Sequence, residues 1–271
     1  MNQPPYNVQE HYAIETKIAE RLRNSTRDER VRLYQWAYDE LYQKIPNHPL
    51  LSVSTEEKNN RIAAEIKNME VFLQPDSVYL EIGSGDCAIA AEVAKRVKQV
   101  YAIDVSKVVA KSFADLPNFE LIITDGIKIP VAENSIDIAY SNQLMEHIHP
   151  EDEILQLENV FRALKKGGSY FCITPNRLSG PHDISRNFDG VATGLHLKEY
   201  SVTEISELFK KIGFSNSKIY LRYSKFNLFL PIFPYKICEK LLDLLPHSLR
   251  KLLTFNKIVR FLLGVKIVAT K

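Results

Sequence analysis

Between residues 77 and 223, short apolar runs alternate with segments of helical pattern, and this alternation constrains the fold more than any other feature. The runs SVYLEIG, QVYAIDV, FELIITD, SIDIAYSN and GGSYFCITP are mostly continuous in apolar residues. Strands that are buried on both faces have this composition, and strand–helix alternation is typical of a parallel sheet in an α/β fold. A last short run, GVKIVATK, predicts a final strand that completes the sheet.

The chain divides into four segments of different pattern. Residues 1–75 are charged and favour helices, and the alternating region follows at 76–224. Residues 225–263 are helical and strongly amphipathic in pattern, and residues 264–271 form the predicted last strand. We therefore expect one α/β core with an N-terminal helical region and a helical insertion before the last strand.

Composition is that of an ordinary globular protein, with 45% hydrophobic and 25% charged residues in a chain of 271. The formal net charge is only +2, but the stretch from Lys225 to Lys271 holds nine basic and two acidic residues. This excess is local and does not predict a nucleic-acid partner. The basic amphipathic helices either make peripheral membrane or lipid contact or pack as a helical hairpin on the domain or against a second subunit.

Three cysteines, Cys87, Cys172 and Cys238, are far apart and form no CxxC pair. Their spacing argues against a disulfide framework or a zinc site and suits a reducing compartment. The polar N-terminus has no secretory h-region, and no apolar run is long enough to span a bilayer. We expect a cytoplasmic protein, and a homo-oligomer is compatible with the sequence.

A glycine turn follows the first strand. Gly83, Ser84 and Gly85 fit the loose G-x-G-x-x-G/A pattern, and Asp104 ends the next strand at the distance of an acid that binds ribose hydroxyls. An NAD-dependent oxidoreductase shares these features. Glu81, however, stands just before the turn, where its charge would repel a pyrophosphate. The same carboxylate suits a ligand that carries ammonium or sulfonium charge.

Polar residues also follow the third and fourth strands. Asp125 and Gly126 end the third strand, where an acid can accept a hydrogen bond from an adenine amino group. Asn142 ends the fourth strand and is followed at once by QLMEHIHP. Open α/β sheets bind their ligands at this carboxyl edge, so these residues predict a ligand site there.

The ordered motifs YLEIGSGDCAIA, YAIDVS, ITDGIKIPVAENSIDIAYSNQLMEHI and RALKKGGSYFCITPN make the chain resemble the class I S-adenosylmethionine-dependent methyltransferases, of the type 11 kind. The resemblance covers about Ser77 to Phe214. It implies a Rossmann-like seven-stranded sheet with one antiparallel strand and helices on both faces, with S-adenosyl-L-methionine as cofactor. It also implies that the N-terminal helices form a lid over the acceptor.

The resemblance further implies which residues bind the cofactor. The glycine turn would back the methionine part, Asp104 the ribose and Val105 the adenine, with Glu81 near the amino end. Asp86 stands where the family more often has a small residue. The full implied set is Glu81, Gly83, Ser84, Gly85, Asp104, Val105, Asp125, Gly126, Ile127 and Asn142.

Candidates for acceptor activation lie beyond the fourth and fifth strands. His147 is the first candidate for a general base, and the alternative is that it only packs over the cofactor. The second is His196, in the long loop after the fifth strand, with a hydrogen bond that fixes the loop as its alternative. His182 and Asp183 lie in the same loop. Two histidines and an aspartate there match no standard ligand spacing, so no metal site is predicted.

Four aromatic residues, Tyr34, Trp36, Tyr38 and Tyr42, recur in the second N-terminal helix. They either line an apolar acceptor pocket or dock the helix on the core.

The predicted function is methyl transfer from S-adenosylmethionine to an oxygen of a sugar, glycan precursor or other small molecule. His196 belongs to the segment HLKEYS, which resembles an element of methyltransferases found with glycan and lipopolysaccharide biosynthesis genes. The alternatives are a lipid or quinone methyltransferase at the membrane surface, an NAD-dependent oxidoreductase, and a binding module without catalysis.

Overall fold

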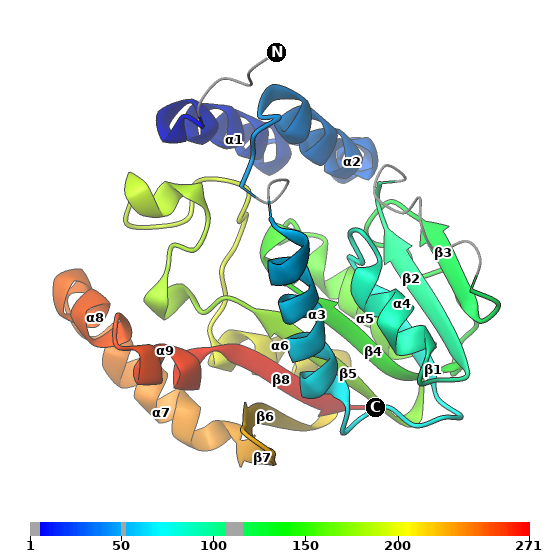
Figure 1. The fold of residues 1–271 in the computed structure, drawn as a ribbon. Helices are drawn as coiled ribbons and strands as arrows, with labels where there is room; N and C mark the ends of the chain where they lie inside the picture. The colour runs from blue at the N-terminus through cyan, green and yellow to red at the C-terminus, as the bar shows by residue number, and fades with distance from the viewer. Residues whose placement is uncertain (1–5, 50–52, 107–115) are drawn as a thin grey trace.

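A computed structural model describes residues 6–49, 53–106 and 116–271, and these residues form an α/β fold around one sheet (Figure 1). The order of the strands across the sheet is β3-β2-β1-β4-β5-β8-β6-β7. The strands are β1 (Val78–Ile82), β2 (Gln99–Asp104), β3 (Phe119–Ile123), β4 (Ile136–Asn142), β5 (Leu164–Thr174), β6 (Ser215–Tyr223), β7 (Phe226–Pro231) and β8 (Val265–Thr270). Strands β1 to β5 pair in parallel, and the C-terminal β8 completes the sheet beside β5, as expected.

The described sheet has eight strands where the sequence predicts seven, and both β7 and β8 run against the five parallel strands. The extra strand, β7, lies at the start of the segment 225–263, whose pattern predicts helix. It forms a hairpin with β6 through Ser224, which adopts φ 55. The ring of Phe229 lies 5.3 Å from that of Tyr220, whose hydroxyl donates to Asn227 Oδ1 at 2.8 Å. These cross-strand contacts and the backbone pairing stabilise an edge strand over a helix.

Helices cover both faces of the sheet, as predicted (Figure 1). One apolar cluster joins Met69 and Val93 to the sheet residue Tyr140, and a second joins Leu157 and Phe209 to the opposite face. The helices are α1 (Val8–Arg23), α2 (Arg27–Lys44), α3 (Thr55–Met69), α4 (Ala88–Ala94), α5 (Glu153–Ala163), α6 (Val202–Ile212), α7 (Ile232–Asp243), α8 (His247–Thr254) and α9 (Lys257–Leu263). Helices α3 and α4 therefore lie on one face, and α5 and α6 on the other.

Helices α1 and α2, called the lid below, lie across the carboxyl ends of the parallel strands (Figure 1). A capping box between Thr26 and Glu29 begins α2. The fully buried Arg30 donates from Nε to Asp152 Oδ2 at 2.7 Å, and the Tyr34 hydroxyl donates to the same oxygen at 3.0 Å. The lid is thereby fixed to the turn before α5.

Helix α7 is attached to the core through a buried acid. Glu239 accepts from the backbone N–H groups of Val202 and Thr203, at 2.7 and 2.8 Å, and from Asn176 Nδ2 at 3.0 Å. Its carboxylate thus satisfies the first N–H groups of α6, where a negative charge is favoured. Nowhere in the described chain does a helix combine the length and apolar character that crossing a bilayer requires.

Candidate functional site

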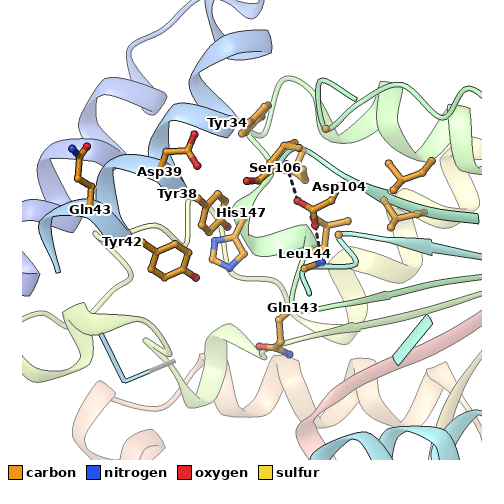
Figure 2. Close-up of a pocket in the computed structure, with 17 residues that line it drawn as sticks. Tyr34, Tyr38, Asp39, Tyr42, Gln43, Asp104, Ser106, Gln143, Leu144 and His147 are labelled. Carbon is orange, nitrogen blue, oxygen red and sulfur yellow. Dashed lines mark hydrogen bonds between the residues drawn. The ribbon is translucent and has the colours of Figure 1, made fainter. Parts of the chain in front are cut away.

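A cavity of about 600 Å³ lies between the carboxyl ends of the central strands and the lid (Figure 2). The core side of its wall comes from the turn after β1, the end of β2, the loop after β3 and the segment after β4. The lid side comes from α2. Six residues of the predicted site line this cavity: Gly83, Gly85, Asp104, Val105, Gly126 and His147.

The glycine turn presents its backbone to the cavity. Gly83 and Gly85 have φ of 72 and 51, in the left-handed region that favours glycine. A Cβ at Gly83 would stand 3.0 Å from Leu144 Cδ1, whereas a Cβ at Gly85 would meet nothing within 4 Å. The N–H of Gly83 donates to the Ile103 carbonyl at 2.9 Å, which fixes the turn to β2.

Asp104 holds the turn as well as lining the cavity. Its Oδ2 accepts from the Gly85 N–H at 2.7 Å and its Oδ1 from the Ser106 N–H at 3.0 Å (Figure 2). Burial raises the pKa of Asp104, and these backbone donors partly oppose the rise. A carboxylate has about four acceptor positions, so both oxygens can still accept hydroxyl groups of a ligand.

Glu81 lies in β1 behind the turn and does not line the cavity. It is 4% exposed, and its Oε2 has no hydrogen-bond partner among the described residues. Burial raises its pKa well above the usual range, and the charges of Asp86 and Asp104 add to the rise. A ligand that brings positive charge to the turn would favour the ionised form of Glu81, so this group of carboxyl side chains fits S-adenosylmethionine.

The unusual Asp86 has a structural role in this turn. Its Oδ1 accepts from the Ala88 N–H at 3.1 Å, at the start of α4, and its carboxylate pairs with Lys58 of α3. The side chain therefore ties two helices of one face to the turn.

Four further predicted cofactor residues do not line the cavity: Ser84, Asp125, Ile127 and Asn142. Asp125 Oδ1 accepts from the N–H groups of Ile127 and Lys128, at 3.0 and 2.8 Å, which shapes the loop that brings Gly126 to the cavity. Direct cofactor contact by these four residues stays a prediction. The residue after Asn142, Gln143, lines the cavity with φ 56.

Three of the four lid aromatics line the cavity. Tyr34, Tyr38 and Tyr42 follow each other at four-residue spacing on one face of α2, as Figure 2 shows. Trp36 faces away, with the Arg21 guanidinium 4.2 Å from its ring centre. The sequence analysis missed Asp39 and Gln43, which line the cavity from the same helix face. Both could have been found from the helical spacing in the sequence, since each follows a cavity-lining tyrosine by one residue.

His147 joins the cavity to the loop after β5. Its Nδ1 donates to the Leu195 carbonyl at 2.9 Å, because a carbonyl oxygen can only accept. The ring stands edge-on to Tyr38, with centroids 5.9 Å apart. The surrounding protein removes water from the ring and lowers its pKa to about 3, and the charge of His196 adds to this. At neutral pH, Nε2 therefore carries a free lone pair.

His196 is 8% exposed and lies behind His147, with ring centroids 4.9 Å apart. Its Nδ1 donates to Glu199 Oε1 at 2.8 Å. Burial opposes protonation, but the Glu199 hydrogen bond and the charge of Glu146 outweigh it, so the pKa of His196 is raised. Glu146 is fully buried, accepts from Thr174 Oγ1 at 2.8 Å, and has its pKa raised to about 7 by burial. The structure thus brings both predicted histidines together with the carboxyl group of Glu146, the residue next to His147 in the sequence.

His182 and Asp183 do not reach the cavity wall. The His182 N–H donates to Glu199 Oε1 at 2.6 Å, and its Nε2 lies 3.1 Å from the Asn176 carbonyl. Asp183 Oδ1 accepts from the Ser185 N–H at 3.0 Å. These contacts hold the long loop in shape.

Comparison with known proteins gives a family match at the site. Residues 80–172 match the family model described as a methyltransferase domain. A probable S-adenosylmethionine-dependent methyltransferase of Mycolicibacterium smegmatis is 27% identical over 136 residues, which cover 50% of this chain and 51% of that protein. The chain thus spans about half the length of the curated relatives it matches.

Solved structures support the fold. A putative methyltransferase of Haloferax volcanii, in complex with the Trm112 activator, superposes with a TM-score of 0.56 and 15% identity, covering 91% of this chain and 99% of that chain. A phosphoethanolamine N-methyltransferase of Haemonchus contortus, solved with S-adenosylhomocysteine, gives a TM-score of 0.52 and 16% identity, covering 78% of this chain and 52% of that chain.

Proposed function

We propose that this chain, which carries a class I S-adenosylmethionine-dependent methyltransferase domain, methylates an oxygen of a sugar, glycan precursor or other small molecule. The observation that carries the proposal is one cavity that joins the glycine turn and Asp104 to His147 under a tyrosine-lined lid. Such a cavity has a place for the methyl donor and a place for a small acceptor.

The donor half of the cavity lies over Gly83, Gly85, Asp104 and Gly126. Tyr34 marks its lid side, since a Cβ on Gly126 would meet Tyr34 Cδ2 at 3.5 Å. S-adenosylmethionine, when bound, supplies an activated methyl group on a sulfonium centre. The residues around it bind the ribose hydroxyls and balance the positive charge.

The acceptor half lies between His147 and the lid residues Tyr38, Tyr42 and Gln43. Aromatic rings and an amide suit a small acceptor with both apolar and hydroxyl-bearing parts. The Nε2 lone pair of His147 is placed to activate an acceptor hydroxyl, with His196 behind it. The chain's task is then to orient the acceptor oxygen and to remove its proton.

Calorimetry with S-adenosylhomocysteine and with NAD tests the cofactor. We expect binding of the first and none of the second, and the opposite result would contradict the proposal. Transfer of a labelled methyl group to panels of sugars and amines then tests the acceptor. We expect His147→Gln to bind S-adenosylhomocysteine but to lose methyl transfer. A product methylated on nitrogen would overturn the assignment to oxygen.

A second candidate is methylation of a lipid or quinone at a membrane surface. It is favoured by the exposed apolar side chains of α7 to α9, among them Phe233, Leu244, Leu252 and Ile258, each at least 70% exposed. Exposed basic residues such as Lys251 lie between them. An apolar helical surface with basic residues suits anionic lipid headgroups.

Co-sedimentation with phosphatidylglycerol vesicles tests this candidate, with phosphatidylcholine vesicles as the uncharged control. Binding to the anionic vesicles that is lost in Leu252→Ser would support it. Equal recovery of the protein in the supernatant with both vesicles would leave the small-molecule acceptor as the proposal. The cytoplasm and a homo-oligomeric state stay sequence-based predictions.

A further inference from the structure

Three side chains of metal-ligand type converge directly behind the acceptor half of the cavity. Glu146 and His147 belong to the short 3-10 helix Met145–His147 after β4, and His196 comes from the loop after β5. One ligand atom from each residue lies within 4.8 Å of the other two. The cluster thus joins two neighbouring residues after β4 to one residue of the loop after β5.

The hydrogen bonds leave one ligand atom free on each histidine. Nδ1 of His147 donates to the Leu195 carbonyl, and Nδ1 of His196 donates to Glu199. Neither Nε2 has a hydrogen-bond partner among the described residues. Metal-binding histidines have this same arrangement, in which the second ring nitrogen donates to a carbonyl or carboxylate that fixes the tautomer.

Glu146 supplies the third free atom. Its Oε2 accepts from Thr174 Oγ1, but its Oε1 is buried and has no hydrogen-bond partner in the described chain. An orphaned carboxylate oxygen at 0% exposure is costly and calls for a partner. A cation between this oxygen and the two rings would provide one.

The charge around the cluster also suits a cation. Two buried carboxylates, Glu146 and Glu199, border His196. The guanidinium of Arg23 reaches the same loop but donates to the carbonyls of Thr193, Gly194 and His196.

We propose that Glu146, His147 and His196 bind one divalent transition-metal cation of the manganese-to-zinc series, with coordination positions left for an oxygen of the acceptor. Two imidazoles and one carboxylate favour such ions, whereas Mg²⁺ prefers oxygen ligands and water. The sequence predicts no metal site from the loop residues His182, Asp183 and His196, whereas the structure groups His196 with Glu146 and His147, which lies 49 positions earlier in the chain.

His147 belongs to both the cluster and the cavity wall, so the cation would lie next to the acceptor half. An acceptor hydroxyl that binds a divalent cation becomes more acidic, which activates its oxygen. In this state Nε2 of His147 is a metal ligand, and the proton of the acceptor hydroxyl passes to solvent water as the new carbon–oxygen bond forms. The role toward the acceptor rests on the proposed function, but cation binding does not.

Titration of the chelator-treated full chain with Co²⁺, followed by visible absorption, tests cation binding without cofactor or acceptor. We expect one Co²⁺ site, displaced by Zn²⁺ and not by Mg²⁺. Glu146→Gln and His196→Gln should lose it. Glu199→Gln, which alters the acceptor of the His196 ring and of the His182 N–H but no proposed ligand, should weaken it by about 10- to 100-fold. His247→Gln on the exposed surface of α8 should bind Co²⁺ as the original chain does.

Absence of a Co²⁺ site in the original chain, or unchanged affinity in Glu146→Gln and His196→Gln, would overturn the proposal. Imidazole nitrogen NMR of the original chain keeps the test independent of variant folding. Zn²⁺ should shift two of the seven histidines, and a shift of none or of a different pair would also overturn it. Calorimetry with S-adenosylhomocysteine on the same samples reports separately on the proposed methyltransferase function.

Discussion

Arg30 and Asp152 form a buried, two-bonded ion pair between the lid and the core, with Nε 2.7 Å from Oδ2 and Nη2 3.1 Å from Oδ1. Both side chains are 1% exposed. Asp152 also accepts from the Tyr34 hydroxyl, and Tyr34 lines the cavity. The ion pair therefore fixes the position of one cavity wall.

Replacing Arg30 should destabilise the whole protein. Arg30→Leu removes the two-bonded partner of the buried Asp152 carboxylate and leaves only the half-exposed Arg27, 3.9 Å away, as a counter-charge. The loss of such a buried partner costs about 3–5 kcal/mol. Arg32→Leu, at an exposed position of the same helix, should change the free energy of unfolding by less than about 0.5 kcal/mol. Urea denaturation measures both. Equal stability of the two variants would show that the pair does not hold the lid.

Alanine at the two glycines of the turn should have different effects. Gly83→Ala meets Leu144 at 3.0 Å at a positive φ, so it should lower stability by about 1–3 kcal/mol. Gly85→Ala is strained by its positive φ as well, but it has open space around the new Cβ, which adds a methyl group to the cavity wall. It should lower stability less than Gly83→Ala, by about 1 kcal/mol, and should also weaken S-adenosylhomocysteine binding. Thermal unfolding and calorimetry on both variants check the difference, and the reverse ranking would contradict it.

Asp104→Ala should weaken S-adenosylhomocysteine binding by about 10- to 100-fold, since it removes hydrogen bonds from a charged acceptor. Part of the loss would come from the turn, because Gly85 also loses its acceptor. Asp86→Ala is the matched control, since it removes an acid of the same turn that does not line the cavity. The affinity of Asp86→Ala for S-adenosylhomocysteine should stay within about threefold of that of the original chain. Calorimetry that gave unchanged affinity for Asp104→Ala would disprove the cofactor assignment.

Tyr42→Ala should raise the acceptor KM while leaving S-adenosylhomocysteine affinity nearly unchanged, because Tyr42 lines the acceptor half of the cavity. Loss of one well-packed aromatic contact should raise this KM by about 10-fold or more. Trp36→Ala, on the other face of α2, should leave this KM unchanged. Steady-state kinetics with the identified acceptor measures both, and an effect confined to Trp36→Ala would reject the division of the cavity.

His48 should make stability depend on pH. Burial lowers its pKa to about 4, and nearby His11 adds to this, while Glu15 acts in the opposite direction. The unfolded chain, with an ordinary histidine pKa of about 6.5, binds more protons between these values. The free energy of unfolding should therefore fall as pH drops from about 6.5 to 4, by at most about 3 kcal/mol from this residue.

Urea denaturation of His48→Gln at pH 7 and pH 5 measures that contribution. The variant should lose less stability than the original chain over this interval. His247→Gln, at an exposed position, should follow the original chain. A pH response of His48→Gln equal to that of the original chain would rule out His48 as its source.

Much of the core could be predicted from the sequence, because local pattern determined it. Strands β1, β2, β4, β5 and β8 are mostly buried and read as apolar runs, and the half-buried edge strand β3 reads so as well. Strand β7 was missed because FNLFLP has no strict alternation, and only its pairing with β6 makes it a strand. Whether such a segment forms a strand depends on its pairing with the neighbouring strand.

The site could be predicted from the sequence where the position of a residue follows from the strand order. Gly83 directly follows β1 and Asp104 ends β2, so both lie at the carboxyl edge of the sheet. Which side chains stand on the wall and which behind it depends on loop geometry, as the difference between Gly126 and Asp125 shows. The approach of His196 to Glu146 depends on the loop after β5, whose path has no periodic pattern.

The two walls of the cavity come from different parts of the chain. The matched family region, residues 80–172, holds the whole glycine turn, Asp104 and His147, but no part of α2. Five residues on one face of this 18-residue helix form the opposite wall, and one of them, Tyr34, borders the donor half. Under the proposed function, exchange of residues 38–43 alone between related chains would therefore change which molecule is methylated, while Tyr34 and the core keep the methyl donor.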